Sequence, residues 1–216
     1  MDTDTLQKAL KQLKESSKKR NFAQSVDLII NLKDLNLKVP EQQVDQFVAL
    51  HYPVGKAIKI CGLVGPELRE DAEKAFDKMI TATEFDQFKD KKAIKKLAEE
   101  YDYFVAQANI MGKVAGAFGK VLGPKNKMPN PKAGCVVPPK TNLAVLSERL
   151  HKTVRAVAKA QPCIKVIVGN ENQDEKEVID NIMTIYNSVS HRLPKEEHNI
   201  KSVLLKLTMS KPVKIK

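Results

Sequence analysis

The chain has 216 residues, of which 42% are hydrophobic, so it can fill one large or two ordinary domains with a packed core, and extensive disorder is excluded. Its 37 Lys and Arg residues outnumber its 26 Asp and Glu residues, and the formal net charge of +11 favours an anionic partner. Only five of the basic residues are Arg and there is no Trp, which favours recognition of phosphates and shape over reading of base edges or stacking on single strands.

Other classes of protein are excluded by local patterns. The sequence has no apolar run of 18 residues and its N-terminus is polar, so we expect neither a membrane span nor a signal peptide. Cys61, Cys135 and Cys163 lie far apart, which argues against a disulfide framework and against a thiolate metal site. The four His residues also lack metal-ligand spacing. We therefore predict no metal, no cofactor and a reducing compartment, the cytoplasm.

The N-terminal part predicts elements of an α+β domain. Leucines recur at helical spacing within residues 4–19, which indicates an amphipathic helix. Alternation over Ser25–Leu32 predicts a strand. A polar link then leads to a short predicted strand at Phe47–Leu50.

From Ala57 onward, strand and helix patterns alternate. Apolar runs at 57–64, 79–82 and 103–108 predict strands, and the segments that follow them carry apolar residues at helical spacing. Thr83 is expected to cap one of these helices. Such alternation predicts a parallel sheet of βαβ units.

The C-terminal part returns to an α+β pattern. Strands are predicted at 154–159, 163–168 and 203–208. A long helix between the last two is expected to begin with a capping box of Asn172 and Glu175.

The combined fold prediction is an α+β domain split between residues 1–54 and 153–216, with an α/β Rossmann-like domain inserted at 55–152. The chain then crosses between domains near 51–55 and 151–153. The residues expected at these crossings, and hence as a hinge, are His51, Tyr52, Pro53, Gly55, His151 and Lys152. For the two His residues, an ordinary surface position is the alternative.

A lysine-rich segment points most directly to a partner. Residues 103–147 contain six Lys and no Asp or Glu. In its middle, Lys125, Lys127 and Lys132 alternate with Gly, Pro and Asn, which do not form a regular helix. Ammonium groups without neighbouring carboxylates suit a polyanion, most commonly nucleic acid. A solvated loop with a chance bias in charge explains the same composition equally well.

No catalytic motif is complete. Gly112–Lys120 resembles a phosphate-binding loop, but the pattern that ends at Gly119-Lys120 requires Gly at position 114 and Ser or Thr at 121, and both are Val. Gly62–Gly65 lacks the glycine spacing of dinucleotide sites. We therefore predict that the chain is not an enzyme. A nucleotide-binding enzyme that uses the parallel sheet is the alternative from a different class.

Two short segments suit RNA but have plain structural alternatives. Phe22 follows several cationic residues, so its ring could lie against a ribose or a base, or could close the core of the first helix. Thr208-Met209-Ser210 ends the last predicted strand. Its hydroxyl groups and thioether suit approach to ribose 2′-hydroxyls, or simply end the strand.

Four motifs carry a family resemblance: Arg20-Asn21-Phe22-x-Gln24-Ser25-Val26-Asp27, Leu122-Gly123-Pro124-Lys125-x-Lys127-Met128-Pro129-x-Pro131, Val168-Gly169-Asn170-Glu171 and Lys206-Leu207-Thr208-Met209. In this order, over essentially the whole chain, they resemble the L-one family of large-subunit ribosomal proteins, and most of all its archaeal branch. The resemblance implies the split two-domain fold described above.

The resemblance also implies a function. Members form a mobile stalk of the large subunit, bind ribosomal RNA and act as transfer RNA leaves the exit site, and many repress translation by binding their own messenger RNA. It implies a cytoplasmic, ribosome-bound protein without a membrane, monomeric when free. The implied RNA-binding residues are Phe22, Gln24, Ser25, Lys159, Lys165, Thr208, Met209, Ser210 and Lys211. Lys125, Lys127 and Lys132 become a secondary contact to ribosomal or transfer RNA.

Three departures from the family pattern stand out. Ser210 replaces a Gly, Leu50-His51-Tyr52-Pro53-Val54-Gly55 replaces Leu-Pro-His-Gly-x-Gly, and Lys159-Ala160 replaces an Arg-Asp pair. We expect these changes to alter affinity and the bending of the crossing. Two alternatives stay open: a regulator of messenger RNA that acts away from the ribosome, and a protein-interaction module without RNA dependence.

Overall fold

The computed structural model describes residues 2–88 and 90–216, and the chain divides into two compact units. The discontinuous unit joins the chain up to Lys56 with Lys152–Lys216, and the continuous unit contains Ala57–His151. Both units combine helices with a sheet, so the mixed α/β composition predicted from the sequence is confirmed.

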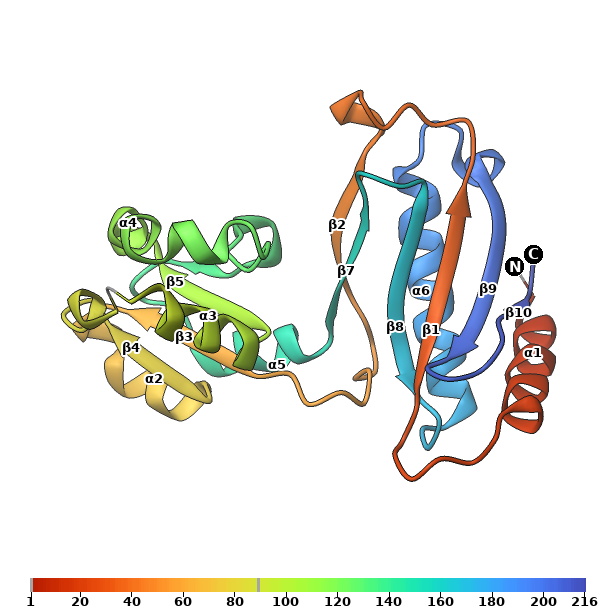
Figure 1. Ribbon diagram of the computed structural model, residues 1–216, viewed down its shortest axis with the longest axis horizontal. Coiled ribbons are helices and arrows are strands. Elements are labelled where there is room, and N and C mark those ends of the chain that lie inside the picture. Colours follow the sequence, from red (N-terminus) through yellow and green to blue (C-terminus); the bar gives the residue numbers. More distant parts are fainter. Residues whose placement is uncertain (1, 89) are drawn as a thin grey trace. The chain divides into compact units, whose positions relative to one another are not determined.

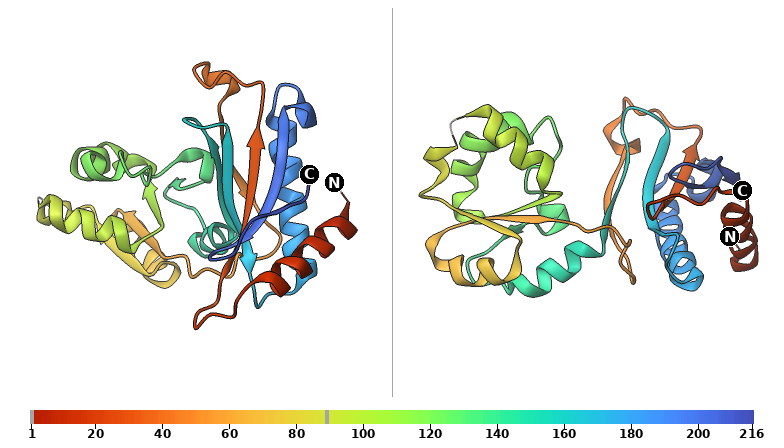
Figure 2. Two further views of the ribbon diagram at one scale, coloured as in Figure 1. Left: turned by 45° about the vertical axis from the view of Figure 1, so that its right-hand side comes forward. Right: turned by 60° about the horizontal axis from the view of Figure 1, so that its bottom comes forward.

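The discontinuous unit is built on a four-stranded antiparallel sheet in the order β10-β9-β1-β8 (Figure 1). Its strands are β1 (Ser25–Leu32), β8 (Cys163–Asn170), β9 (Ile200–Leu207) and β10 (Val213–Lys214). Alternate residues of β1 are buried, because successive side chains of a strand point to opposite faces. Helices α1 (Thr3–Ser16) and α6 (Glu175–Arg192) cover the buried face (Figure 2). The β1 side chains that point to the other face are only partly buried.

Helix α6 begins at Glu175 because the Asp174 side chain caps it, accepting a hydrogen bond from the Lys176 backbone N–H at 3.1 Å. The capping box predicted from Asn172 and Glu175 is therefore wrong. Asn172 lies in the preceding turn. Glu175 instead accepts a hydrogen bond from Lys14 Nζ at 3.0 Å, which ties α1 to α6.

The remaining strands of this unit, β2 (Val44–Ala49) and β7 (Thr153–Ala158), form a two-stranded antiparallel ribbon. The last residue of β2 pairs with the first residue of β7. Beyond this pair, the Leu50 N–H donates to the Lys152 carbonyl at 2.8 Å. The chain therefore leaves the discontinuous unit and returns to it at the same end of the ribbon.

The continuous unit contains a parallel four-stranded sheet in the order β4-β3-β5-β6. The strands are β3 (Ile60–Val64), β4 (Lys78–Thr81), β5 (Tyr103–Gln107) and β6 (Val136–Val137). All of β3 is buried because helices cover both faces of the sheet, with α3 and α4 on one face and α2 and α5 on the other (Figure 2). These helices are α2 (Arg69–Ala75), α3 (Lys91–Glu100), α4 (Met111–Leu122) and α5 (Leu143–His151).

Helix α3 is capped by Asp90, whose side chain accepts a hydrogen bond from the Lys92 N–H at 2.9 Å. The prediction that Thr83 caps a helix is wrong, because its hydroxyl bonds the Thr81 hydroxyl at 2.9 Å ahead of a 3₁₀ turn. The 3₁₀ turns of the chain are η1 (Pro40–Gln42), η2 (Pro66–Leu68), η3 (Phe85–Gln87), η4 (Ala108–Ile110), η5 (Pro131–Ala133) and η6 (Glu196–Asn199).

The cysteines are free thiols. Burial raises the pKa of Cys61 to about 12 and that of Cys135 to about 11, so both stay protonated and pack as small apolar groups. Among the residues described, no three His, Cys, Asp or Glu side chains lie close enough to hold a metal ion. None of the described helices is long and apolar enough to cross a membrane.

Candidate nucleic-acid interface

Three chain segments meet at one end of the antiparallel sheet: the start of β1, the end of β8 and the end of β9. The register pairs Ser25 with Asn170, and Val26 with Leu207. Ser25 and Thr208 exchange two hydrogen bonds, from Ser25 N–H to Thr208 Oγ1 at 3.1 Å and from Thr208 N–H to the Ser25 carbonyl at 3.2 Å. The structure thus brings together residues that lie 183 positions apart in the sequence.

Gln24 fixes this junction from inside. Only 1% of its surface is exposed, so it supports the surface and is not positioned to contact RNA. Its Oε1 accepts a hydrogen bond from the Met209 N–H at 3.1 Å, and its Nε2 donates to a Glu171 carboxylate oxygen at 3.2 Å. Its backbone carbonyl accepts a further bond from the Glu171 N–H at 2.9 Å. One buried side chain therefore holds the loops after β8 and β9 together.

Large apolar side chains project from the same junction. Phe22 is 51% exposed, so its alternative placement in the core is wrong. Met209 is 60% exposed. The exposed Thr208 and Lys211 lie beside Met209 in the chain. We call the surface formed by Phe22, Ser25, Thr208, Met209 and Lys211 the sheet-end surface.

Ser210 closes the turn that presents Met209. Its hydroxyl oxygen accepts a hydrogen bond from the Leu207 N–H at 2.9 Å and approaches the Leu207 carbonyl at 3.4 Å. The Ser210 side chain therefore folds back onto the chain. Its hydroxyl is engaged by the backbone of the turn, with a further contact to the Lys211 carbonyl at 3.1 Å.

The open face of the sheet continues this surface. A groove of about 300 Å³ lies there, lined by Asp27, Ile29, Lys165, Val166, Ile167 and Lys206. Lys165 is opposite Ile29 in the register, and Lys206 is opposite Asp27. Burial raises the pKa of Asp27, and the nearby Lys206 charge partly opposes the shift. Sequence reasoning missed Asp27 and Lys206, although the period of two places them on the same face as Ser25 and Thr208.

Lys159 lies elsewhere. It follows β7 and precedes the start of β8, which pairs with the end of β1 far from Ser25. Its Nζ lies 2.7 Å from a carboxylate oxygen of Asp45, which also accepts two hydrogen bonds from Arg155 at 2.9 and 3.0 Å. The structure therefore does not bring Lys159 to the predicted RNA-binding cluster.

Two of the three loop lysines are engaged within the continuous unit. Lys125 Nζ lies 2.9 Å from a Glu99 carboxylate oxygen, so the acid-free segment is neutralised there by an acid from outside it. Lys127 Nζ donates to the carbonyls of Ala98 and Tyr101 at 2.8 and 2.7 Å, and so satisfies the C-terminus of α3. The Lys132 side chain is exposed.

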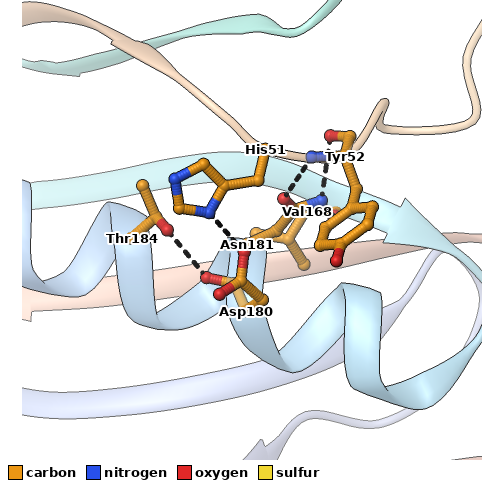
Figure 3. Close-up of polar contacts among 6 residues, drawn as sticks. All are labelled: His51, Tyr52, Val168, Asp180, Asn181 and Thr184. Carbon is orange, nitrogen blue, oxygen red and sulfur yellow. Dashed lines mark hydrogen bonds and ion pairs between the residues drawn. The ribbon is translucent and has the colours of Figure 1, made fainter.

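The outgoing crossing segment is bound to α6 (Figure 3). His51 Nδ1 lies 2.6 Å from Asp180 Oδ2. The fully buried Asn181 accepts a hydrogen bond from the Tyr52 N–H at 3.3 Å and donates to the carbonyls of Tyr52 and Val168 at 3.2 and 3.0 Å. Both the oxygen and the nitrogen of the Asn181 side-chain amide are therefore hydrogen-bonded to backbone groups.

The rest of the predicted hinge is less tightly bound. The Pro53 carbonyl accepts a hydrogen bond from Gln173 Nε2 at 3.1 Å. Gly55 has φ of +71°, and a Cβ there would lie 2.9 Å from the Asn170 Cβ, so this position requires Gly. On the return path, His151 ends α5, and the Lys152 carbonyl accepts the hydrogen bond from Leu50.

The chain matches the family model "Ribosomal protein L1p/L10e family" over residues 13–211. It is similar to proteins named "Large ribosomal subunit protein uL1" from three archaea. It is 41% identical to the one from Methanothermococcus thermolithotrophicus, over 100% of this chain and 99% of that one. It is 39% identical to the one from Methanobrevibacter smithii, over 99% of both chains.

The third relative, from Pyrococcus abyssi, is 38% identical over 100% of this chain and 97% of its own. Since both the family model and these relatives extend over the two units, the likeness concerns the entire architecture. The chain therefore belongs to the Ribosomal protein L1p/L10e family, in its archaeal form.

Proposed function

We propose that the chain is a non-enzymatic protein of the large ribosomal subunit, which binds ribosomal RNA through the sheet-end surface. The observation that carries this proposal is the exposure of Phe22 and Met209 on a junction that Gln24 holds rigid. Exposed apolar side chains surrounded by hydroxyl and ammonium groups suit riboses and bases flanked by phosphates. The relatives are named as proteins of this subunit, which supports the same assignment.

Recognition would rest on shape and not on a base code. Met209 and the Phe22 ring would cover riboses or unstacked bases, the Thr208 hydroxyl would meet 2′-hydroxyls, and Lys165 and Lys206 would contact phosphates along the open face of the sheet. The two lysines are compact point charges without the fork that reads guanine.

The proposal extends to the stalk and to regulation. The exposed Lys132 of the continuous unit would be a secondary contact to transfer RNA at the exit site, where the protein would assist release of the deacylated molecule. Motion between the units would start after Pro53, because His51, Tyr52 and Pro53 are bound to Asp180, Asn181 and Gln173 of their own unit. Its own messenger RNA would bind the sheet-end surface and be repressed. We place the protein on ribosomes in the cytoplasm, monomeric when free.

The primary test measures affinity for the ribosomal RNA fragment that crosslinks to the protein in intact large subunits. We expect Met209→Ala and Phe22→Ala each to weaken binding about tenfold with little change in the salt dependence, because they remove apolar contacts. Lys165→Ala should instead lower the slope of log K against log salt by about one. Val145→Ala is the matched control, since Val145 is 61% exposed but lies on α5. Normal affinity of folded Met209→Ala and Phe22→Ala would place the RNA elsewhere.

The distribution of the protein in cell extracts distinguishes a ribosomal protein from a regulator that acts away from the ribosome. Sedimentation of cell extracts should recover most of the protein with large subunits. Recovery mainly with free messenger RNA would favour the regulator.

The contacts at the end of β3 argue against the alternative that the chain is a nucleotide-binding enzyme. There the Gly65 N–H, which would have to face a phosphate, donates to the buried Gln107 Oε1 at 2.8 Å. A Cβ on Gly65 would lie 2.8 Å from the same oxygen, so Gly serves packing at this position. The following turn and α2 begin with Glu67, Glu70 and Asp71, whose charges repel phosphate. Equilibrium dialysis with ATP should show no saturable binding.

A further inference from the structure

A second surface lies in the continuous unit, between η3, α3 and α4. Here a groove of about 640 Å³ opens to solvent, a size typical of ligand and peptide sites. Its apolar lining includes Phe85, Ile94 and Val121, whose side chains belong to the core below. The groove is therefore shaped by well-packed residues and not by a loose loop.

The rim of the groove is positively charged. Lys91, Lys113 and Lys120 line it, and all three are exposed. None of their side chains forms an ion pair or hydrogen bond with a residue that the structure describes. One acid, Asp86, shares the lining, so the groove carries a net charge of about +2. Its unpaired ammonium groups call for carboxylates or phosphates from outside the chain.

Glycines leave the backbone of α4 uncovered by side chains beside this rim. A Cβ on Gly112, Gly116 or Gly119 would meet nothing within 4 Å, so packing inside the chain does not require Gly at these positions. Each Gly costs a helix about 1 kcal/mol relative to Ala. Gly116 lines the groove itself. A partner can therefore approach the α4 backbone closely at that point.

We propose that this groove binds an acidic amphipathic helix of a partner protein. The apolar face of that helix would lie on Gly116 and on the partly exposed Ala82 and Ala117, above the buried Phe85, Ile94 and Val121, and its acids would meet the lysines of the rim. α4 has 12 residues and is about 18 Å long, so the contact spans about three turns of each helix. Close approach of two helices requires small residues at the crossing, which Gly116 and Ala117 supply.

RNA fits this groove less well. Phosphates would satisfy the lysines but would leave the partly exposed Ala82 and Ala117 uncovered. Phe85 is 6% exposed, so it presents no ring face on which a base could stack. The mixture of apolar floor and cationic rim therefore favours a protein helix over nucleic acid.

The test uses the full chain and a fluorescein-labelled peptide of about 18 residues, with Leu on one helical face and Glu on the other, and a scrambled peptide of equal composition. We expect saturable binding, followed by fluorescence anisotropy, to be at least about tenfold tighter for the amphipathic peptide. Equal binding of the two peptides would show charge attraction alone and overturn the proposal.

Two matched substitutions on α4 locate the site. Gly116→Leu should fill the groove and weaken peptide binding by at least about tenfold, with the helix intact because the new Cβ has open space. Gly112→Leu makes the same change outside the lining and should leave binding within about twofold. Equal effects of the two substitutions would overturn the proposal. So would a Gly116→Leu protein that loses affinity for a short RNA duplex but keeps affinity for the peptide.

Discussion

At the scale of single residues, an exposed side chain of the sheet-end surface and the buried side chain that supports this surface are close neighbours in the chain. Phe22 is exposed, whereas Gln24 is buried and bonds both Met209 and Glu171. The Met209 backbone is held in place by this buried side chain. The sheet-end surface therefore depends on a residue that does not reach it.

Gln24→Ala should reduce the free energy of unfolding by about 1–3 kcal/mol, because it leaves the Met209 N–H and the Glu171 carboxylate without their buried partner. RNA affinity should fall with it, because the turn that carries Met209 loses its support. Urea unfolding and RNA titration measure the two effects.

Gln24→Glu is the matched variant. It retains an acceptor for Met209 but brings a second carboxylate to Glu171, so stability should be lost near neutral pH and partly regained in acid. A Gln24→Ala protein with unchanged stability and affinity would contradict the supporting role.

At the scale of elements, charged side chains join the two strands of the β2–β7 ribbon. Asp45 on β2 accepts two hydrogen bonds from Arg155 on β7 and also pairs with Lys159. The Arg155 guanidinium also lies 5.3 Å from the centre of the Phe47 ring. A two-stranded ribbon is marginal by itself, so these contacts matter more than surface ion pairs usually do.

The Asp45 carboxylate should make stability depend on acid pH. The hydrogen bonds from Arg155, with a smaller contribution from Lys159, lower its pKa from 3.8 to about 2. A lowered pKa means that the ionised acid stabilises the fold above pH 3.8, and that this contribution disappears as the pH falls through about 2. Asp45→Asn should reduce the free energy of unfolding by about 1 kcal/mol at pH 7, after allowance for solvent screening. The difference from the unsubstituted protein should vanish below about pH 2, as measured by denaturant unfolding across pH. A difference that stays constant with pH would contradict this account.

The crossing segment is a second element, and Asn181 anchors its backbone at Tyr52. Asn181→Ala removes every side-chain bond to the Tyr52 backbone, so hydrogen exchange at the Tyr52 amide should become at least about tenfold faster. Thr184→Ala, one turn along α6, removes only a bond to the Asp180 carbonyl and serves as the control. Equal exchange rates at Tyr52 in the two variants would show that Asn181 does not anchor the segment.

At the scale of the whole molecule, one RNA surface is proposed for two RNA ligands. If ribosomal RNA and the messenger leader both bind the sheet-end surface, they should compete, and Met209→Ala should weaken both by a similar factor of about ten. Competition titrations with the two purified RNAs measure this. Simultaneous binding of both RNAs to one protein molecule would contradict it.

Local pattern predicted much of the architecture. The alternation over Ser25–Leu32 coincides with β1, because a half-buried strand imposes a period of two. Contacts between distant residues could not be predicted in this way. The pairing of Lys159 with Asp45 and the bonds from Lys127 to the carbonyls at the end of α3 depend on the tertiary fold.

The candidate site shows the same limit. Phe22 and Gln24 lie outside any regular element, so no periodicity indicates which of them is buried. The charge of the acid-free segment indicated a polyanion. It did not reveal that Glu99 and the α3 carbonyls engage two of its lysines.

The ribbon has a consequence for the connectivity of the chain. Because β2 and β7 are antiparallel neighbours, with Leu50 bonded to Lys152, the whole continuous unit occupies the position of a hairpin loop. Loop tips are where chains tolerate large insertions. Replacing the residues between Leu50 and Lys152 by an Asn-Gly turn would restore an uninterrupted hairpin. The smaller protein would then need an apolar residue in place of Asn181, which would have lost Tyr52 as its partner. A split domain and a continuous one thus differ by a single excision.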